Sequence, residues 1–455
     1  MSDKSEKLYD GITNIREELV EQAERKKNPA WKRRGMRAAA AVLALVFVLG
    51  VLLNPGGGGG TVASAYTIAE AKYPKAADVQ NPPKGYADGL EEYFAASIRQ
   101  FLAGAETANK VYSPVNVYMA LAMLAEVTGG SSRQQILDLL GSGSIEALRT
   151  QAASVWNAQY RDGDAVTSIL ASSLWLNEDV SFVQSTMDTL AETYYASSYR
   201  GEMGSDGFNR ALQSWLNEQT RGLLTEQAGQ IELDADTILA IAATVYYKAP
   251  WDNDFNKERT TQDVFHAASG DVTCDFMHQS VTGTYYWGER FSAVRRSMAA
   301  DGGAMWFILP DEGYTPEDLL ADEQAAAFIL NRGDWENNKR LIVNQSIPKF
   351  DVTSQIDLRE GLQALGVTDV FDPALSDYTP MTTDRSDIFL TKAQHDARVI
   401  IDEEGVEAAA YTVLANPGAG MPPEEEIDFV VDRPFLFVIN GADSLPLFVG
   451  VVNQP

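Results

Sequence analysis

The chain has 455 residues, of which 45% are hydrophobic, so it is long enough to bury a large core. Its 36 lysine and arginine residues against 64 aspartate and glutamate residues give a formal charge of −28, which argues against nucleic acid as a partner. The single cysteine, Cys274, excludes an intramolecular disulfide and any metal site built from several thiolates.

A basic cluster precedes an apolar run near the start of the chain. Residues 26–37, KKNPAWKRRGMR, are followed by the uncharged run 38–53, AAAAVLALVFVLGVLL. A spanning helix needs about 17 to 25 apolar residues, and the uncharged residues 54–60 extend this stretch. Because basic residues stay on the cytoplasmic side, we expect a cytoplasmic tail at 1–37 and a single transmembrane helix or signal anchor at 38–53. The rest of the chain would then lie on the extracellular side of the cell membrane.

Two other interpretations of the apolar run stay open. Ala63, Ser64 and Ala65 have the small-x-small form of a signal-peptidase site, so cleavage near Ala65 would give a secreted protein. A buried core helix is the third interpretation, although the basic cluster and the polyglycine at 56–60 argue against it. We prefer the anchor because a charged tail of this length is long for a signal sequence.

Residues 54–71 are predicted to form a glycine-rich linker, followed by a folded domain at 72–455. Apolar residues at helical spacing predict helices at 89–105 and 113–130, the second with Ser113 as its N-cap and a proline in its first turn. Runs rich in β-branched and aromatic residues predict strands at 168–176, 237–249, 302–310 and 340–352. Helices early and long strands late, without βαβ alternation, indicate an α+β fold around one large sheet.

Motifs of the common enzyme classes are absent from the sequence. There is no nucleophile elbow, P-loop, dinucleotide fingerprint or HExxH motif. The three histidines, His266, His278 and His395, lie at no metal-ligand spacing from one another. We therefore expect neither catalysis nor a metal or other cofactor.

An alanine-rich segment precedes a loop of glycines and prolines, in the stretch RVIIDEEGVEAAAYTVLANPGAGMPP at 398–423. As a strand, its period of two would place small apolar side chains on one face, namely Val406, Ala408, Ala410, Thr412 and Leu414. The other face would carry Glu407, Ala409, Tyr411 and Val413. The first face suits a strand that slides into an existing sheet over a packed core, with Gly405 as its hinge. On this pattern alone, an ordinary alanine-containing loop remains the alternative.

Residues 400–414, IIDEEGVEAAAYTVL, resemble the hinge of the reactive centre loop in serpins, a family of serine protease inhibitors. Other serpin-like motifs follow the family order, namely VYSPVNVYMALAMLAEVTGG at 111–130, SSLWLN at 172–177, WLNEQTRGLL at 215–224, ATVYYKAPWDNDF at 243–255, MWFILPDEG at 305–313, IPKFDVTSQIDLREGLQALGVTDVF at 347–371, DRPFLFVI at 432–439 and PLFVGVVNQP at 446–455. The resemblance covers the chain from about residue 89 to its end. It implies the serpin fold, with a helical N-terminal part, a large central sheet, smaller sheets and an exposed reactive centre loop.

The resemblance implies a suicide inhibitor rather than an enzyme. A target serine or cysteine protease would attack the loop and form an acyl-enzyme, and insertion of the cleaved loop into the sheet would trap a covalent complex with the monomeric inhibitor. The implied hinge residues are Glu403, Glu404, Gly405, Val406, Glu407, Ala408, Ala409, Ala410, Tyr411 and Thr412. A non-inhibitory serpin that binds or carries an extracellular ligand is the alternative, which charged residues or prolines at the inward hinge positions would mark. The hinge has neither at those positions.

Serpin spacing from the hinge glycine places the scissile bond between Ala419 and Gly420. A small residue before the bond suits the shallow pocket of an elastase-like or subtilisin-like protease, whereas trypsin-like enzymes need a basic residue. The bonds 418–419 and 420–421 are the alternatives.

Residues that support loop insertion are also implied by the resemblance. Ser113, Pro114 and His395 resemble the shutter beneath the opening of the sheet. The breach, where insertion begins, would hold Trp251 and an ion pair between Lys349 and Glu403. Two positions depart from the family, because Ala243 replaces an asparagine and Asn116 replaces a serine. We expect the amide of Asn116 to hydrogen-bond His395 in place of the missing asparagine.

Overall fold

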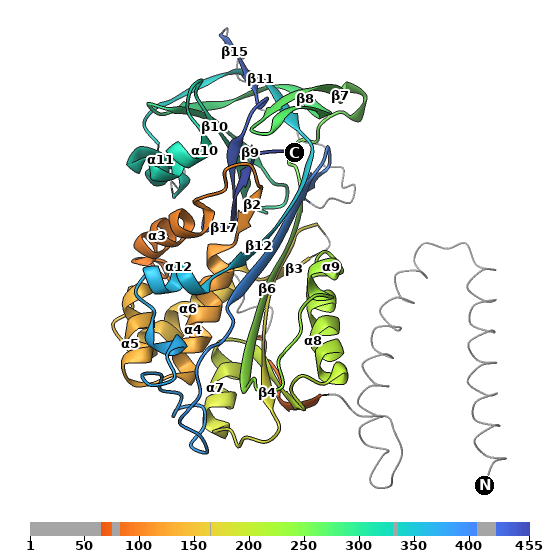
Figure 1. Cartoon of the computed structure of the whole chain (residues 1–455). Coiled ribbons are helices and arrows are strands. Elements are labelled where there is room, and N and C mark those ends of the chain that lie inside the picture. The colour runs from red at the N-terminus through yellow and green to blue at the C-terminus, as the bar shows by residue number, and fades with distance from the viewer. Residues whose placement is uncertain (1–64, 75–81, 164, 331–334, 407–424) are drawn as a thin grey trace, which may run out of the picture. The chain divides into compact units, whose positions relative to one another are not determined.

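A computed structural model of the chain describes residues 65–74, 82–163, 165–330, 335–406 and 425–455 (Figure 1). They belong to the second of two units into which the chain divides, Ser64–Pro455. The predicted tail, the predicted span and most of the predicted linker lie outside the described residues.

The main sheet has eight strands in the order β1-β5-β4-β6-β14-β13-β12, with β3 beside β4. Their bounds are β1 Tyr66–Ala69, β3 Arg161–Asp162, β4 Thr167–Asn177, β5 Ala196–Gly201, β6 Leu239–Pro250, β12 Phe350–Asp357, β13 Gln394–Ile401 and β14 Gly405–Val406. β4 and β5 are parallel, and the other pairs are antiparallel. The central strands β4 and β6 run along most of the sheet (Figure 1).

The second sheet has nine strands in the order β15-β11-β8-β9-β10-β16-β17-β2, with β7 beside β8. Their bounds are β2 Lys110–Tyr112, β7 Thr261–Ala267, β8 Gly270–Trp287, β9 Phe291–Ser297, β10 Ala304–Pro310, β11 Asn338–Pro348, β15 Glu426–Val430, β16 Phe435–Asn440 and β17 Pro446–Val452. Every residue of β10, β16 and β17 is buried, which explains why these strands read as unbroken apolar runs rather than as alternating ones.

Helices cover both faces of the main sheet. The helices are α3 Leu90–Leu102, α4 Pro114–Val127, α5 Gly130–Leu139, α6 Ile145–Gln159, α7 Gln184–Thr193, α8 Asp206–Gln219, α9 Thr225–Ala228, α10 Pro316–Ala321, α11 Glu323–Ile329 and α12 Arg359–Ala364. α4 is almost wholly buried and packs against β6 and β17, whereas α8 lies on the opposite side of β6 (Figure 1). The side-chain oxygen of Ser113 caps α4 by accepting a hydrogen bond from the N–H of Asn116 at 3.3 Å.

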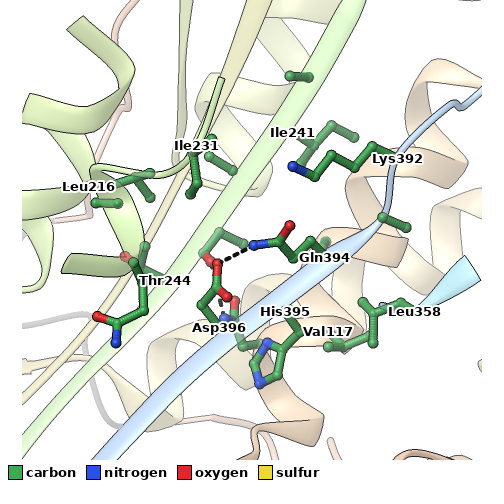
Figure 2. A pocket seen from close by; sticks show the side chains of 18 of the residues that line it. Val117, Leu216, Ile231, Ile241, Thr244, Leu358, Lys392, Gln394, His395 and Asp396 are labelled. Carbon is green, nitrogen blue, oxygen red and sulfur yellow. Dashed lines mark hydrogen bonds between the residues drawn. The ribbon is translucent and has the colours of Figure 1, made fainter. Parts of the chain in front are cut away.

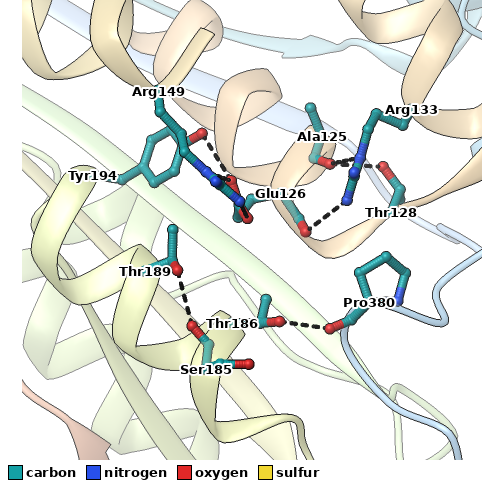
Figure 3. Close-up of polar contacts among 10 residues, drawn as sticks. All are labelled: Ala125, Glu126, Thr128, Arg133, Arg149, Ser185, Thr186, Thr189, Tyr194 and Pro380. Carbon is teal, nitrogen blue, oxygen red and sulfur yellow. Dashed lines mark hydrogen bonds and ion pairs between the residues drawn. The ribbon is translucent and has the colours of Figure 1, made fainter. Parts of the chain in front are cut away.

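An ion pair between the buried Glu126 of α4 and the partly exposed Arg149 of α6 joins these two helices (Figure 3). Arg149 donates to both carboxylate oxygens of Glu126, at 2.9 and 2.5 Å, and the hydroxyl of Tyr194 donates to the same carboxylate at 3.2 Å. Glu126 is only 3% exposed. Loss of Arg149 would leave the buried carboxylate of Glu126 without its cation, so the pair fixes how α4 and α6 pack against each other.

The predicted α+β class, with a helical N-terminal part and a large central sheet, is confirmed. One boundary differs, because β1 lies inside the range predicted to be linker. Tyr66, Thr67 and Ala69 pair antiparallel with β5, and the N–H of Ala71 donates to the hydroxyl of Ser197 at 3.1 Å. The ordered body therefore begins before residue 72.

The predicted membrane-anchored location is corrected. No helix among the described residues is long and apolar enough to cross a membrane. The longest of them, α6, has 15 residues and rises about 22 Å, which is less than the roughly 30 Å of a hydrocarbon core. The predicted span at 38–53 lies outside the part of the chain that the structure describes, so the structure provides no membrane-spanning element for the location predicted from the sequence.

Candidate functional site

The main sheet is open between β6 and β13. Among the described residues, only the two of β14 lie between these strands, where Gly405 pairs with Pro250 and Val406 pairs with Ala249 and Ile401. Beyond β14, no strand among the described residues joins β6 to β13. The described part of this segment therefore ends at Val406, the second residue of β14.

A cavity of about 240 Å³ occupies the opening between β6 and β13 (Figure 2). Val117 of α4 and Leu358 line one side, whereas Leu216 and Ile231 line the other. The lining also contains buried polar atoms without a hydrogen-bond partner in the described structure, namely Thr244 Oγ1, Asp396 Oδ1 and Gln227 Oε1. Because unpaired buried polar atoms are costly, the cavity suits an occupant that offers both small apolar side chains and hydrogen-bonding groups.

Gly405 occupies a position that no other residue can take without moving β6. A β-carbon there would lie 2.3 Å from the carbonyl oxygen of Ala249 and 2.7 Å from Cα of Pro250. Both contacts are to backbone, and the φ of 155° is one that L side chains rarely adopt. The next residue, Val406, is 3% exposed and packs into the core.

The turn between β13 and β14 is fastened to the chain that follows β6. The backbone N–H of Trp251 donates to the carbonyl of Glu404, and its indole N–H donates to the carbonyl of Asp402, each at 2.9 Å. The backbone N–H of Phe255 donates to the carbonyl of Glu403 at 2.9 Å. Glu404 also forms an ion pair with Lys257. These contacts fix the place where the alanine-rich segment begins.

Lys349 and Glu403 form the ion pair expected from the resemblance, with 3.0 Å between Nζ and Oε2. The other carboxylate oxygen of Glu403 accepts from the hydroxyl of Thr260 at 2.7 Å. Burial raises the pKa of this carboxyl, but hydrogen bonds from Thr260, its own backbone and Lys349 lower it by more, so the pKa lies below its ordinary value. Glu403 is therefore ionised at neutral pH, and it connects Lys349, which lies just before β12, and Thr260 to the base of the loop.

Ser113, Pro114 and His395 meet at the start of α4, beneath the opening. The Nε2 atom of His395 accepts a hydrogen bond from the backbone N–H of Ser113 at 3.0 Å, and Pro114 is the first residue of α4. The predicted contact between Asn116 and His395 is wrong. The amide of Asn116 donates instead to the carbonyl of Ala243 on β6 at 3.1 Å, because α4 presents its first turn to β6 there.

The remaining predicted site residues lie outside the described residues. They are Glu407, Ala408, Ala409, Ala410, Tyr411 and Thr412 of the hinge, and Ala419 and Gly420 of the reactive bond. Three residues that the sequence did not single out belong to the site, namely Asp402, Phe255 and Thr260. Phe255 and Asp402 lie within the serpin-like segments 243–255 and 400–414, and this placement was the signal in the sequence that could have identified them.

Comparison with known proteins agrees with this geometry. Residues 90–455 match the family described as Serpin (serine protease inhibitor). Serpin-ZX of Arabidopsis thaliana is 28% identical over 77% of this chain and 93% of its own length. Alpha-1-antitrypsin 1-5 of Mus musculus is 28% identical over 81% of this chain and 89% of its own length.

Solved structures show the same fold. The native state of the thermophilic serpin tengpin covers 86% of this chain and 100% of its own, with a TM-score of 0.75 and 21% identity. Human thyroxine-binding globulin in complex with thyroxine covers 81% of this chain and 99% of its own, with a TM-score of 0.71 and 19% identity. At these identities the two structures bear on the fold alone.

Proposed function

This chain belongs to the serpin family, and on that premise we propose that it is a suicide inhibitor of serine proteases. Serpins inhibit proteases or carry ligands and are not catalysts, in agreement with the prediction that the chain is not an enzyme. The proposal is that a protease cleaves the loop after β14, and that the freed segment then extends β14 along the opening between β6 and β13.

One observation carries this proposal, which is the two-residue strand β14 at the mouth of a cavity between β6 and β13, where no other described strand joins them. Extension of β14 would pair its backbone with both β6 and β13, and each net hydrogen bond contributes about 1 kcal/mol. Val406 already packs inward, so the period of two would bring Ala408, Ala410 and Thr412 into the cavity. Their small volume suits the space, and the gain in stability would power the trapping of the protease.

The target protease follows from the residue before the bond. With Ala419 in that position, we propose an elastase-like or subtilisin-like enzyme, whose shallow pocket accepts a small apolar side chain. Cleavage must leave an acyl-enzyme that lives longer than the time needed for insertion. If insertion were slower than hydrolysis, the protease would be released and the chain would be a substrate.

The apolar cavity also favours a second candidate function, a non-inhibitory serpin that carries a small ligand. Thyroxine-binding globulin, whose solved structure holds thyroxine, has the same fold. Against this candidate, the hinge has no charged residue or proline at an inward position. The two functions differ in what happens after the loop is cut.

The test is incubation of the full chain with an elastase and, separately, with a subtilisin, followed by denaturing gels and mass spectrometry. We expect an SDS-stable complex whose released peptide begins at Gly420. A matched pair of variants separates insertion from loop recognition, because Ala410→Arg puts a charge on the inward face and Ala409→Arg puts it on the outward face. The inhibitor proposal predicts that Ala410→Arg is cleaved without complex and that Ala409→Arg still traps. If both enzymes cleave the wild-type chain without forming an SDS-stable complex, the inhibitor proposal is wrong for elastase-like and subtilisin-like proteases.

A further inference from the structure

Arg296 is a buried cation close to the base of the loop. It lies on β9 and is 6% exposed, and within the described residues it forms no ion pair. One guanidinium nitrogen donates to the side-chain oxygens of Gln279 and Gln345, each at 2.8 Å. The other terminal nitrogen donates to the carbonyl of Asn253 at 2.5 Å. Neutral oxygens thus accept from both terminal nitrogens, whereas Nε has no hydrogen-bond partner among the described residues. The carboxylate of Asp254 attracts the charge without forming an ion pair with it.

The guanidinium of Arg296 also covers two aromatic rings. Its central carbon lies 3.9 Å from the ring centre of Phe255 and 5.2 Å from that of Trp251. The two rings meet edge to face at 6.3 Å with an interplanar angle of 84°. Burial lowers the pKa of Arg296 to about 9, so the group is charged at neutral pH and its attraction to both rings is strengthened by the lack of water.

These two residues provide the donors from 251–255 to the base of the loop. Trp251 donates to the carbonyls of Asp402 and Glu404, and Phe255 donates to the carbonyl of Glu403. Arg296 therefore contacts the side chains of both residues of 251–255 that donate to 402–404, and it binds the carbonyl of Asn253 in the turn between them.

We propose that Arg296 is a positioning residue for loop insertion, which holds the segment 251–255 rigid so that this segment retains the base of the loop until the loop is cut. The inference rests on the proposed function. Extension of β14 carries the chain beyond Val406 along β6 and β13, and it starts from the turn after β13 that 251–255 tethers. A loose tether would let this turn shift and the uncut loop insert early, which would shorten the life of the uncut, active state.

A simple packing role does not account for a charge at this position. A methionine fills a similar volume, packs well against aromatic rings and leaves no charge to desolvate. It cannot bind the two glutamine oxygens and the Asn253 carbonyl at once. A comparison of the wild type with Arg296→Met therefore separates the tethering role from simple packing.

The test measures how fast the uncut full chain loses its ability to trap protease at 37 °C, for Arg296→Met, Arg296→Lys and two controls. Arg295→Met changes the exposed neighbour on the same strand, which donates to Ser297. Val155→Ala in the buried part of α6 provides a loss of stability far from the loop. Spontaneous insertion is scored independently of any protease, as the appearance of a form that resists unfolding in urea.

We expect Arg296→Met to lose activity by insertion about tenfold faster than the wild type, the change that one charged hydrogen bond produces. Arg296→Lys keeps the cation over the rings but has fewer fixed donors, so its rate should fall between the two. Arg295→Met should match the wild type.

Equal rates for Arg296→Met and Val155→Ala, at equal loss of unfolding stability, would overturn the inference. If Arg296→Met does not fold, Arg296→Lys decides the question by the same comparison. A wild-type chain that neither traps protease nor ever converts to the urea-resistant form would overturn the proposed function itself, and this inference with it. Normal trapping by the wild type with unchanged rates in the variants would overturn only the role of Arg296.

Discussion

Protonation of His395 should destabilise the native chain in mildly acidic solution. The imidazole is 4% exposed at the start of α4, and its Nε2 accepts from the backbone N–H of Ser113 at 3.0 Å. The ring of Tyr112 lies against it, with 5.5 Å between ring centres. A protonated Nε2 could not accept that bond and would place a charge in the core, and burial lowers the pKa of His395 from 6.5 to about 4.

The size and sign of the effect follow from this shift. In the unfolded chain the histidine keeps a pKa near 6.5, so between about pH 6.5 and pH 4 the unfolded state binds a proton that the folded state does not. The free energy of unfolding therefore falls as the pH falls through this window, by about 3 kcal/mol in total. Below about pH 4 both states bind the proton, and His395 causes no further loss.

Urea unfolding of the native full chain at a series of pH values between 7.5 and 4 measures this effect, with His395→Gln as the comparison. Glutamine can still accept from Ser113 through its side-chain oxygen but does not titrate. We expect most of the loss seen in the wild type over this range to be absent from the variant. A variant whose stability falls as steeply as that of the wild type would refute the assignment to His395.

Three further changes test the site. Glu403→Gln should lower the free energy of unfolding by about 2 kcal/mol, because Lys349 loses its charged partner, and a double-mutant cycle with Lys349→Met should be clearly non-additive. Gly405→Ala should cost roughly 2 kcal/mol and displace β14, seen as faster hydrogen exchange at Val406, because the new methyl meets the backbone of β6. Asn116→Ala should cost about 1 kcal/mol and increase polymer formation on native gels, since it removes the side-chain bond to a β6 carbonyl; unchanged unfolding and no added polymer would count against that bond.

Long, buried elements were predictable from the sequence. Ser113, the proline after it and the paired glycines at 129–130 marked both ends of α4. The strands predicted at 168–176 and 237–249 correspond to β4 and β6, which are rich in apolar, β-branched and aromatic residues. β1 was not predicted, because four residues at an edge carry little pattern and their partner strand lies about 130 residues away along the chain.

The polar contacts of the site could not be predicted from residue spacing alone, because they depend on the register of the strands and on where α4 lies. Lys349 and Glu403 could be paired only through the family resemblance, because they lie 54 residues apart. The partner of Asn116 was wrongly predicted, since either His395 or β6 was within reach until α4 was placed. Arg296 was missed because it follows another arginine, and only the register of β9 shows that one faces the core and the other faces solvent.

Insertion of the cut loop between β6 and β13 is tested most directly by the unfolding temperature of the full chain before and after cleavage of the loop. The chain is cut with a catalytic amount of a zinc protease, which forms no acyl-enzyme and so is not trapped. The position of the cut is read by mass spectrometry, and both forms are heated at the same pH. Because an extended β14 adds backbone hydrogen bonds and fills the cavity, we predict that the cut form unfolds at a clearly higher temperature than the intact form. An equal or lower unfolding temperature after cleavage within 407–424 would contradict insertion.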